Sequence, residues 1–171
     1  STSRRQRQMC IRDRMEEISQ LNETFDVVVS SLAFHYVEDF SGVVRNIYDL
    51  LEPGGNFIFS QENPLCTCHS GENRWTRDEN GEKLYLNLAN YGVEGERESV
   101  WFVDNVKKYH RTFSTIINTL IEAGFTVEKM IEPLPDDELL EKYPDYKDLF
   151  HKPDFLLVRV RKTPKKYQSS F

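Results

Sequence analysis

The stretch FDVVVSSLAFHYVED, residues 25–39, starts as a strand and ends in side chains that can do chemistry. Its apolar, β-branched beginning, Phe25–Val29, is typical of a strand that is covered on both faces. Polar and aromatic residues follow directly, namely Ser30, Ser31, Phe34, His35 and Tyr36. Because ligands of open α/β sheets bind beyond the carboxyl ends of the parallel strands, we expect these residues to line the mouth of a crevice.

A helix is predicted immediately after this stretch. Glu38 and Asp39 supply an N-cap and first-turn acids. Apolar residues then recur at three- and four-residue spacing, at Phe40, Val43, Val44, Ile47, Leu50 and Leu51. Pro53-Gly54-Gly55 is predicted to stop this helix, and Asn56–Ser60 is the next expected strand. Strand, helix and strand then form a right-handed parallel crossover.

The second half of the chain repeats this alternation after a long polar excursion that begins at residue 62. Arg97–Phe102 and Val106–His110 are predicted to pair as a hairpin. The later elements are expected to be a helix, a strand, two short helical pieces and a final strand, at Thr112–Ala123, Phe125–Ile131, Asp136–Tyr143, Tyr146–Phe150 and Asp154–Val160. This order predicts an α/β sheet whose last strand runs antiparallel beside Phe125–Ile131.

Composition narrows the kinds of partner. The 171 residues suffice for one domain, and a net charge of −6 argues against a broad nucleic-acid footprint. No apolar run approaches the roughly 20 residues that cross a bilayer, so no membrane partner is expected. Cys10, Cys66 and Cys68 form no disulfide framework, which favours the cytoplasm. The spacing in Cys66-Thr67-Cys68-His69 is too short for a structural zinc site, so no metal is predicted.

Residues 1–14, STSRRQRQMCIRDR, differ in character from the rest, with five arginines, one acid and no usable periodicity. One interpretation is a disordered basic arm for anionic partners. The other is a non-native leader, because MCIRD at Met9–Asp13 resembles the in-frame translation of a sequencing-library adapter. We expect the second, in which case the natural sequence is interrupted upstream of Met15.

Three segments together resemble the second half of a class I S-adenosylmethionine-dependent methyltransferase of the bacterial, small-molecule type. They are FDVVVSSLAFHYVED, VVRNIYDLLEPGGNFIFSQENP and YHRTFSTIINTLIEAGFTVEKMIEP. The resemblance covers residues 15–162 and implies a truncated Rossmann-like sheet made of the family's strands four to seven, the last antiparallel. It also implies an inserted hairpin or lid at about residues 62–111, a frayed tail at 163–171, and S-adenosylmethionine as cofactor. The glycine-rich G-x-G-x-G motif of the family does not occur in these 171 residues.

The resemblance also implies where the cofactor lies. Met15 and Glu16 match the segment that holds the adenine ring, and the family's aspartate at the preceding position is replaced by Arg14. Ser31 and Leu32 match positions that contact the cofactor near its reactive methyl group. His35 lies one turn further on, and is expected to act as a general base or a substrate hydrogen bond. The alternative is a histidine that only caps or packs.

Further candidates follow from the same crevice edge and from the inserted hairpin. Tyr36 is expected in the pocket wall, and Glu62 and Asn63 follow the strand next to it. His110 is a second catalytic candidate. His110 or Arg111 is expected to grip an anionic substrate, and Tyr109 is expected to bind the substrate. Trp101 is expected to serve as a lid aromatic or as packing for the hairpin.

These residues predict methyl transfer from S-adenosylmethionine to a small molecule, impaired in this chain because the glycine-rich loop is missing. The sequence does not identify the acceptor. Two alternatives stay open, another nucleotide-binding α/β enzyme of the dehydrogenase kind and a non-catalytic fragment. A hydrolase is disfavoured because no serine lies in a G-x-S-x-G motif.

Overall fold

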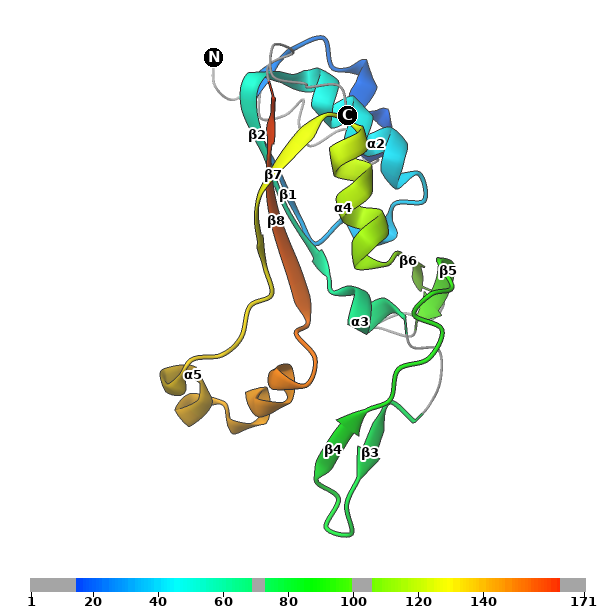
Figure 1. Cartoon of the computed structure of the whole chain (residues 1–171), viewed down its shortest axis with the longest axis vertical. Helices are drawn as coiled ribbons and strands as arrows, with labels where there is room; N and C mark the ends of the chain where they lie inside the picture. Colours follow the sequence, from blue (N-terminus) through cyan, green and yellow to red (C-terminus); the bar gives the residue numbers. More distant parts are fainter. Residues whose placement is uncertain (1–14, 69–72, 100–105, 164–171) are drawn as a thin grey trace.

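The computed structural model describes residues 15–68, 73–99 and 106–163. Within them a central sheet has the strand order β1-β2-β8-β7 (Figure 1). The strands are β1 (Phe25–Ser31), β2 (Leu51–Glu62), β7 (Phe125–Ile131) and β8 (Phe155–Lys162). Strand β1 pairs with β2 in parallel, and β8 lies antiparallel between β2 and β7. The α/β class and the antiparallel last strand are therefore confirmed.

Helices α2 (Phe40–Leu50) and α4 (Phe113–Glu122) cover one face of the sheet (Figure 1). Asp39 caps α2 by accepting a hydrogen bond from the backbone N–H of Gly42, and Thr112 caps α4 by accepting one from Thr115. Both helices bury the apolar stripe that their spacing predicts. The core between helices and sheet includes Phe34, Val44, Phe57, Phe59, Ile116 and Leu156.

The opposite face of the sheet is open over β1 and β2 among the described residues. Val27 and Val29 of β1 are 50% and 68% exposed, and Ile58 of β2 is 36% exposed. The sequence predicted that Phe25–Val29 would be covered on both faces. In the described part of the chain only Val28 of the three valines packs against the core. This prediction is therefore wrong for the residues that the structure describes.

Strand β2 begins earlier than predicted. Leu51 to Gly55 belong to the strand, and Leu51 already pairs with Phe25. The helix ends at Leu50, before Pro53-Gly54-Gly55, and these three residues form an irregular stretch in the β1–β2 register. Gly54 has φ of +85°, in the left-handed region that glycine enters without a steric penalty.

The long insertion is more ordered than the sequence suggested. It contains α3 (Pro64–Thr67), the hairpin β3 (Trp75–Arg77) with β4 (Lys83–Leu86), and the hairpin β5 (Gly95–Ser99) with β6 (Val106–His110). The second hairpin confirms the predicted pairing, although its first strand starts at Gly95. The β3–β4 hairpin was missed. It projects from the body at the bottom of Figure 1.

The chain between β7 and β8 forms a second projection. It contains α5 (Asp137–Lys142) and the 3₁₀ helix η3 (Pro144–Phe150), close to the two predicted helical pieces. Two further 3₁₀ turns, η1 (Met15–Gln20) and η2 (Phe34–Tyr36), flank β1. No helix in the described ranges is long and apolar enough to span a bilayer. The predicted leader (1–14), Trp101 and the predicted frayed tail from residue 164 lie outside the described residues.

Candidate functional site at the carboxyl ends of β1 and β2

The carboxyl end of β1 turns sharply away from the sheet. Leu32 has φ of +51°, a left-handed conformation that is uncommon for a residue with a side chain and that concentrates at functional positions. Its backbone N–H donates to the carbonyl oxygen of Ser60 on β2 across 2.9 Å. Ser31 and Leu32 are both exposed at this edge. The two residues predicted to contact the cofactor therefore lie at an accessible strand end.

The 3₁₀ turn η2 places His35 beside the end of β2. Phe34 anchors this turn, since its buried ring lies 5.0 Å from that of Phe59 and 5.4 Å from that of Phe40, measured between centroids. His35 is only 4% exposed. Its Nδ1 accepts a hydrogen bond from the backbone N–H of Glu62 across 3.2 Å, and its Nε2 lies 3.9 Å from Glu62 Oε1.

This hydrogen bond determines the tautomer of His35. Because Nδ1 accepts a hydrogen bond from a backbone N–H, it carries no proton itself, and the neutral ring must carry its proton on Nε2. Burial lowers the pKa of His35 below the ordinary value of 6.5, an effect that the carboxylate of Glu62 opposes and the ammonium of Lys108 reinforces. At neutral pH the side chain is therefore a hydrogen-bond donor at Nε2, and its lone pair at Nδ1 is already used.

Glu62 is held by a cation that the sequence analysis missed. Lys108 of β6 places its Nζ 2.5 Å from Glu62 Oε1, and its side chain is only 13% exposed. The alternation of side chains along a strand could have predicted this position. Lys107 points outward to Glu96, so Lys108, the next residue, must point to the opposite face. The cluster of His35, Glu62 and Lys108 joins η2, the end of β2 and the inserted hairpin, so three separate segments meet at one place.

Tyr36 and Tyr109 surround this cluster. The Tyr36 ring centroid lies 4.1 Å from that of His35, and the residue is partly exposed. The Tyr109 hydroxyl donates to Glu38 Oε2 across 3.3 Å. Both side chains therefore lie next to the open strand edge, and their predicted contact with a substrate stays a prediction.

Arg111 has a different place from the predicted one. Its guanidinium donates to the carbonyl oxygens of Val37 and Glu38 and lies over the ring of Phe40, 5.1 Å from the centroid. These contacts fasten β6 to the loop that precedes α2. The predicted grip on an anionic substrate is replaced by bonds within the protein.

His110 also departs from its predicted catalytic role in an open cleft. It is fully buried, with Nδ1 2.8 Å from the Thr67 hydroxyl and Nε2 2.8 Å from the carbonyl oxygen of Tyr91. The carbonyl can only accept, so Nε2 carries the proton. Burial lowers its pKa, an effect that the Tyr91 carbonyl opposes. His110 thus ties the insertion together internally.

Asn63 is likewise structural rather than exposed to a substrate. It is fully buried and caps α3, since its side-chain oxygen accepts from the N–H of Leu65, while its Nδ2 donates to Glu132 Oε1 across 2.6 Å. Met15 packs against the core from η1. Its predicted adenine contact stays a prediction, as does that of Glu16, whose side chain is not among those described.

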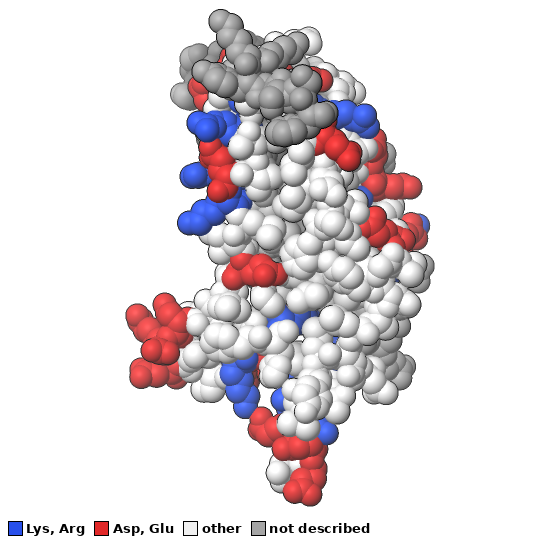
Figure 2. All heavy atoms as spheres, in the orientation of Figure 1, with Lys and Arg blue, Asp and Glu red and all other residues white. Residues whose placement is uncertain are grey.

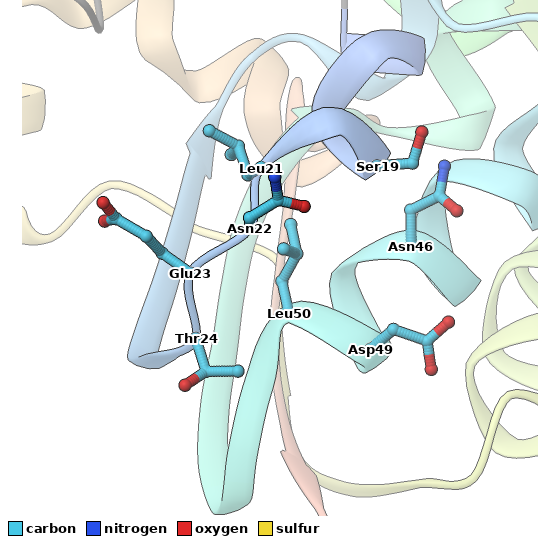
Figure 3. A pocket seen from close by; sticks show the side chains of 8 residues that line it. All are labelled: Ser19, Leu21, Asn22, Glu23, Thr24, Asn46, Asp49 and Leu50. Carbon is cyan, nitrogen blue, oxygen red and sulfur yellow. The ribbon is translucent and has the colours of Figure 1, made fainter.

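Two hollows adjoin the sheet at opposite ends. One, of about 670 Å³, lies beyond the carboxyl end of β7, between the β3–β4 hairpin and the α5–η3 segment. The other, of about 400 Å³, lies at the amino-terminal end of β1. It is lined mainly by polar side chains, including Asn22, Glu23, Asn46 and Asp49 (Figure 3). Only the first is on the edge where α/β sheets bind ligands.

Charge is distributed unevenly over the face seen in Figure 2. Its middle is largely uncharged, and acidic side chains gather on the projecting tips at α5 and at the β3–β4 hairpin. No group of three or more His, Cys, Asp or Glu side chains in the described ranges is arranged as a metal site. Cys66 and Cys68 are free thiols.

The comparisons with known proteins agree with this fold. A family model described as a methyltransferase domain matches residues 1–59. The crystal structure of a candidate S-adenosylmethionine-dependent methyltransferase from Listeria monocytogenes is 36% identical, with a TM-score of 0.78 over 89% of this chain and 68% of that chain. An S-adenosylmethionine-dependent methyltransferase from Mesorhizobium loti is also 36% identical, with a TM-score of 0.74 over 85% of this chain and 67% of that chain.

Two curated proteins are also similar. An uncharacterized protein of Haemophilus influenzae is 41% identical over 152 residues, which are 88% of this chain and 59% of that protein. The mitochondrial arginine-hydroxylase NDUFAF5 of Danio rerio is 36% identical over 119 residues, 69% of this chain and 31% of that protein. The chain thus spans less than two thirds of these relatives. It belongs to the S-adenosylmethionine-dependent methyltransferase family, whose cofactor is S-adenosylmethionine.

Proposed function

We propose that the protein transfers a methyl group from S-adenosylmethionine to a small-molecule acceptor at the carboxyl ends of β1 and β2. Family membership supports the reaction class, and the observation that carries the location is the His35–Glu62–Lys108 cluster beside the exposed turn at Leu32. Partly buried titratable groups of both signs next to an open sheet edge are typical of functional sites.

The residues at this edge fit the methyl end of the cofactor. Ser31 is exposed, and the left-handed turn at Leu32 directs the chain away from the sheet, so both can contact a ligand that lies across the strand ends. The Glu62 carboxylate offers a negative charge compatible with a positive sulfonium. Met15 and Glu16 are proposed for the adenine on the strength of the sequence resemblance alone.

When bound, the cofactor supplies an electrophilic methyl group and its own leaving group. The protein then has to align the acceptor and exclude water. Nε2–H of His35 is a fixed donor that can orient an oxygen or nitrogen of the acceptor. Glu62 is the group placed to take a proton from the acceptor, because its carboxylate lies 3.9 Å from the Nε2 donor of His35. We therefore assign His35 to positioning and Glu62 to proton removal.

The same cluster does not by itself dictate methyl transfer, since one fold can host different reactions. The relative from Danio rerio bears the name of an arginine hydroxylase. Mass spectrometry of the product separates the two reactions, because a methyl group and an oxygen atom add different masses.

The test is incubation of the protein with S-adenosylmethionine labelled with deuterium in its methyl group and a mixture of bacterial metabolites. At a cofactor concentration high enough to offset the missing glycine-rich loop, we expect at least one metabolite to gain the labelled methyl. Glu62→Gln should abolish this gain, while Glu79→Gln, in an exposed turn, should leave it intact. A product that gains oxygen, or labelling that Glu62→Gln does not reduce, would overturn the proposal.

A further inference from the structure

The cavity of about 670 Å³ beyond β7 has the size and composition of a small-molecule site. Its walls carry large apolar side chains that are partly open to solvent, among them Trp75, Leu134, Leu139, Tyr146 and Phe155. Aromatic and aliphatic groups that line a hollow rather than fill the core are a common mark of ligand binding.

The cavity adjoins the cluster at the end of β2. Phe155, in its wall, is the cross-strand partner of Glu62, and the backbone N–H of Asn63 donates to the carbonyl oxygen of Asp154 across 2.9 Å. Asn63 also holds Glu132, the residue before Pro133 in the wall. The wall of the cavity is therefore joined by hydrogen bonds to Asn63, the residue that follows Glu62 at the end of β2.

Two ion pairs close one side of the cavity. Lys83 of β4 pairs with Asp148 of η3, and Lys147 of η3 pairs with Glu82 beside β4 across 2.8 Å. These pairs join two segments that are more than 60 residues apart in the sequence. The β3–β4 hairpin is thus held against η3 as a wall of the cavity.

The six charged side chains that line the cavity sum to zero, but they are not all paired with one another. Lys83 is paired with Asp148, and Lys152, itself buried, is paired with Asp154. Two charged lining residues remain, Arg74 and Asp145. Asp145 is exposed and solvated, whereas the Nε of Arg74 is buried and has no hydrogen-bond partner among the described residues.

The guanidinium of Arg74, which lines the cavity, indicates what the ligand must offer. Arg74 already donates from one terminal nitrogen to the carbonyl oxygen of Cys66 across 2.6 Å, which holds the guanidinium in place. A guanidinium binds a carboxylate with particular strength. A single guanidinium among largely apolar walls can bind a ligand with one negative charge. A phosphate generally requires several hydrogen-bond donors.

From these observations we infer that the cavity binds the acceptor, and that the acceptor is a small carboxylate with an apolar or aromatic body. The identification of this ligand as the methyl acceptor rests on the proposed methyl transfer, whereas its chemical class is inferred from the cavity alone. Arg74 is assigned as the residue that selects the anion, and Leu134 as part of the surface that receives the apolar body.

Calorimetry without cofactor tests the ligand class with three probes that share one ring system. Indole-3-acetate is an anion, 3-methylindole is neutral and tryptamine is a cation. On the unmodified chain we expect indole-3-acetate to bind at least about tenfold more tightly than the other two, the effect of one charged hydrogen bond. Equal affinities, a preference for tryptamine, or no binding of any probe would overturn the inference.

Variants locate the binding. Arg74→Met should remove the preference for indole-3-acetate, whereas Arg45→Met, on the exposed side of α2, should preserve it. Leu134→Ser should weaken all three probes, and Leu84→Ser, on β4 outside the cavity lining, should not. If neither Arg74→Met nor Leu134→Ser changes the affinities, the ligand binds outside this cavity. Because no cofactor is present, failure here leaves the methyl-transfer proposal standing, and failure of methyl transfer leaves the binding result unaffected.

Discussion

The backbone N–H of Glu62 donates to Nδ1 of His35 across 3.2 Å. The last residue of β2 therefore determines which ring nitrogen is protonated in a histidine that follows the neighbouring strand, β1. With Nδ1 occupied, Nε2 must carry the proton of the neutral ring. The histidine predicted as a general base is therefore arranged as a donor. A donor orients an acceptor molecule but does not remove its proton.

The assignment of His35 as a donor predicts different results for two substitutions. Gln carries an amide N–H at nearly the position of Nε2–H, so His35→Gln should keep methyl transfer within about tenfold of the original rate. His35→Leu has no donor and should lose roughly 10²-fold or more, the usual scale for a lost catalytic hydrogen bond. If both variants lose activity equally, His35 acts as a base.

Phe34 is expected to support the site through packing. Its ring is fully buried among those of Phe40, Phe57 and Phe59, and it anchors the turn that carries His35. Phe34→Ala should lower the free energy of unfolding by about 3–5 kcal/mol. Phe150→Ala, at a side chain that is 57% exposed, is the matched control and should change it little. Urea denaturation followed by circular dichroism measures both.

Stability should fall as the solution is acidified below pH 6.5. Burial lowers the pKa values of His35 and His110 in the folded chain from the ordinary 6.5. Below pH 6.5 the unfolded chain therefore binds more protons than the folded one, and the free energy of unfolding decreases until the lowered pKa values are passed. Urea titrations at pH 7.5 and 5.5 check the sign, and His35→Gln should reduce the difference. A rise on acidification would contradict the buried, neutral histidines.

Affinity for the cofactor should be weak in these 171 residues. They contain no G-x-G-x-G motif, whose backbone would hold the amino-acid end of S-adenosylmethionine according to the resemblance. Loss of two or more charge-assisted hydrogen bonds weakens binding by at least about 10². Calorimetry against the Listeria monocytogenes relative measures the difference. Comparable affinities would show that residues elsewhere in this chain replace the motif.

The main elements of the sheet and its helices were predictable because their signals are local. Apolar spacing in α2 and α4 and caps at Asp39 and Thr112 lie within a few residues of what they control. The β3–β4 hairpin was missed although Asn80-Gly81 is a common hairpin signal, since the flanking strands are only three and four residues long. There Asp78 accepts from the N–H groups of Asn80 and Glu82 and shapes the turn.

The site was predictable only in part, for a physical reason. His35 and Glu62 could be predicted to lie at one edge of the sheet, because the carboxyl ends of neighbouring parallel strands lie at the same edge. The internal bonds of His110 and Arg111 were not predictable because their partners lie far away in the sequence. Tyr91 is 19 residues from His110, and Val37 is 74 residues from Arg111. Chemical type and spacing do not reveal whether a polar side chain is already satisfied inside the protein.

The position of β8 has a consequence for how the protein is made. Strand β8 is the last of the described strands in the sequence, yet it lies between β2 and β7 and pairs with both. During synthesis β7 has no neighbour in this sheet until residues 155–162 have left the ribosome. The strand edge at Glu62 and the wall at Phe155 are likewise separate until then. Assembly of the site is therefore expected to wait until β8 has emerged and inserted between β2 and β7.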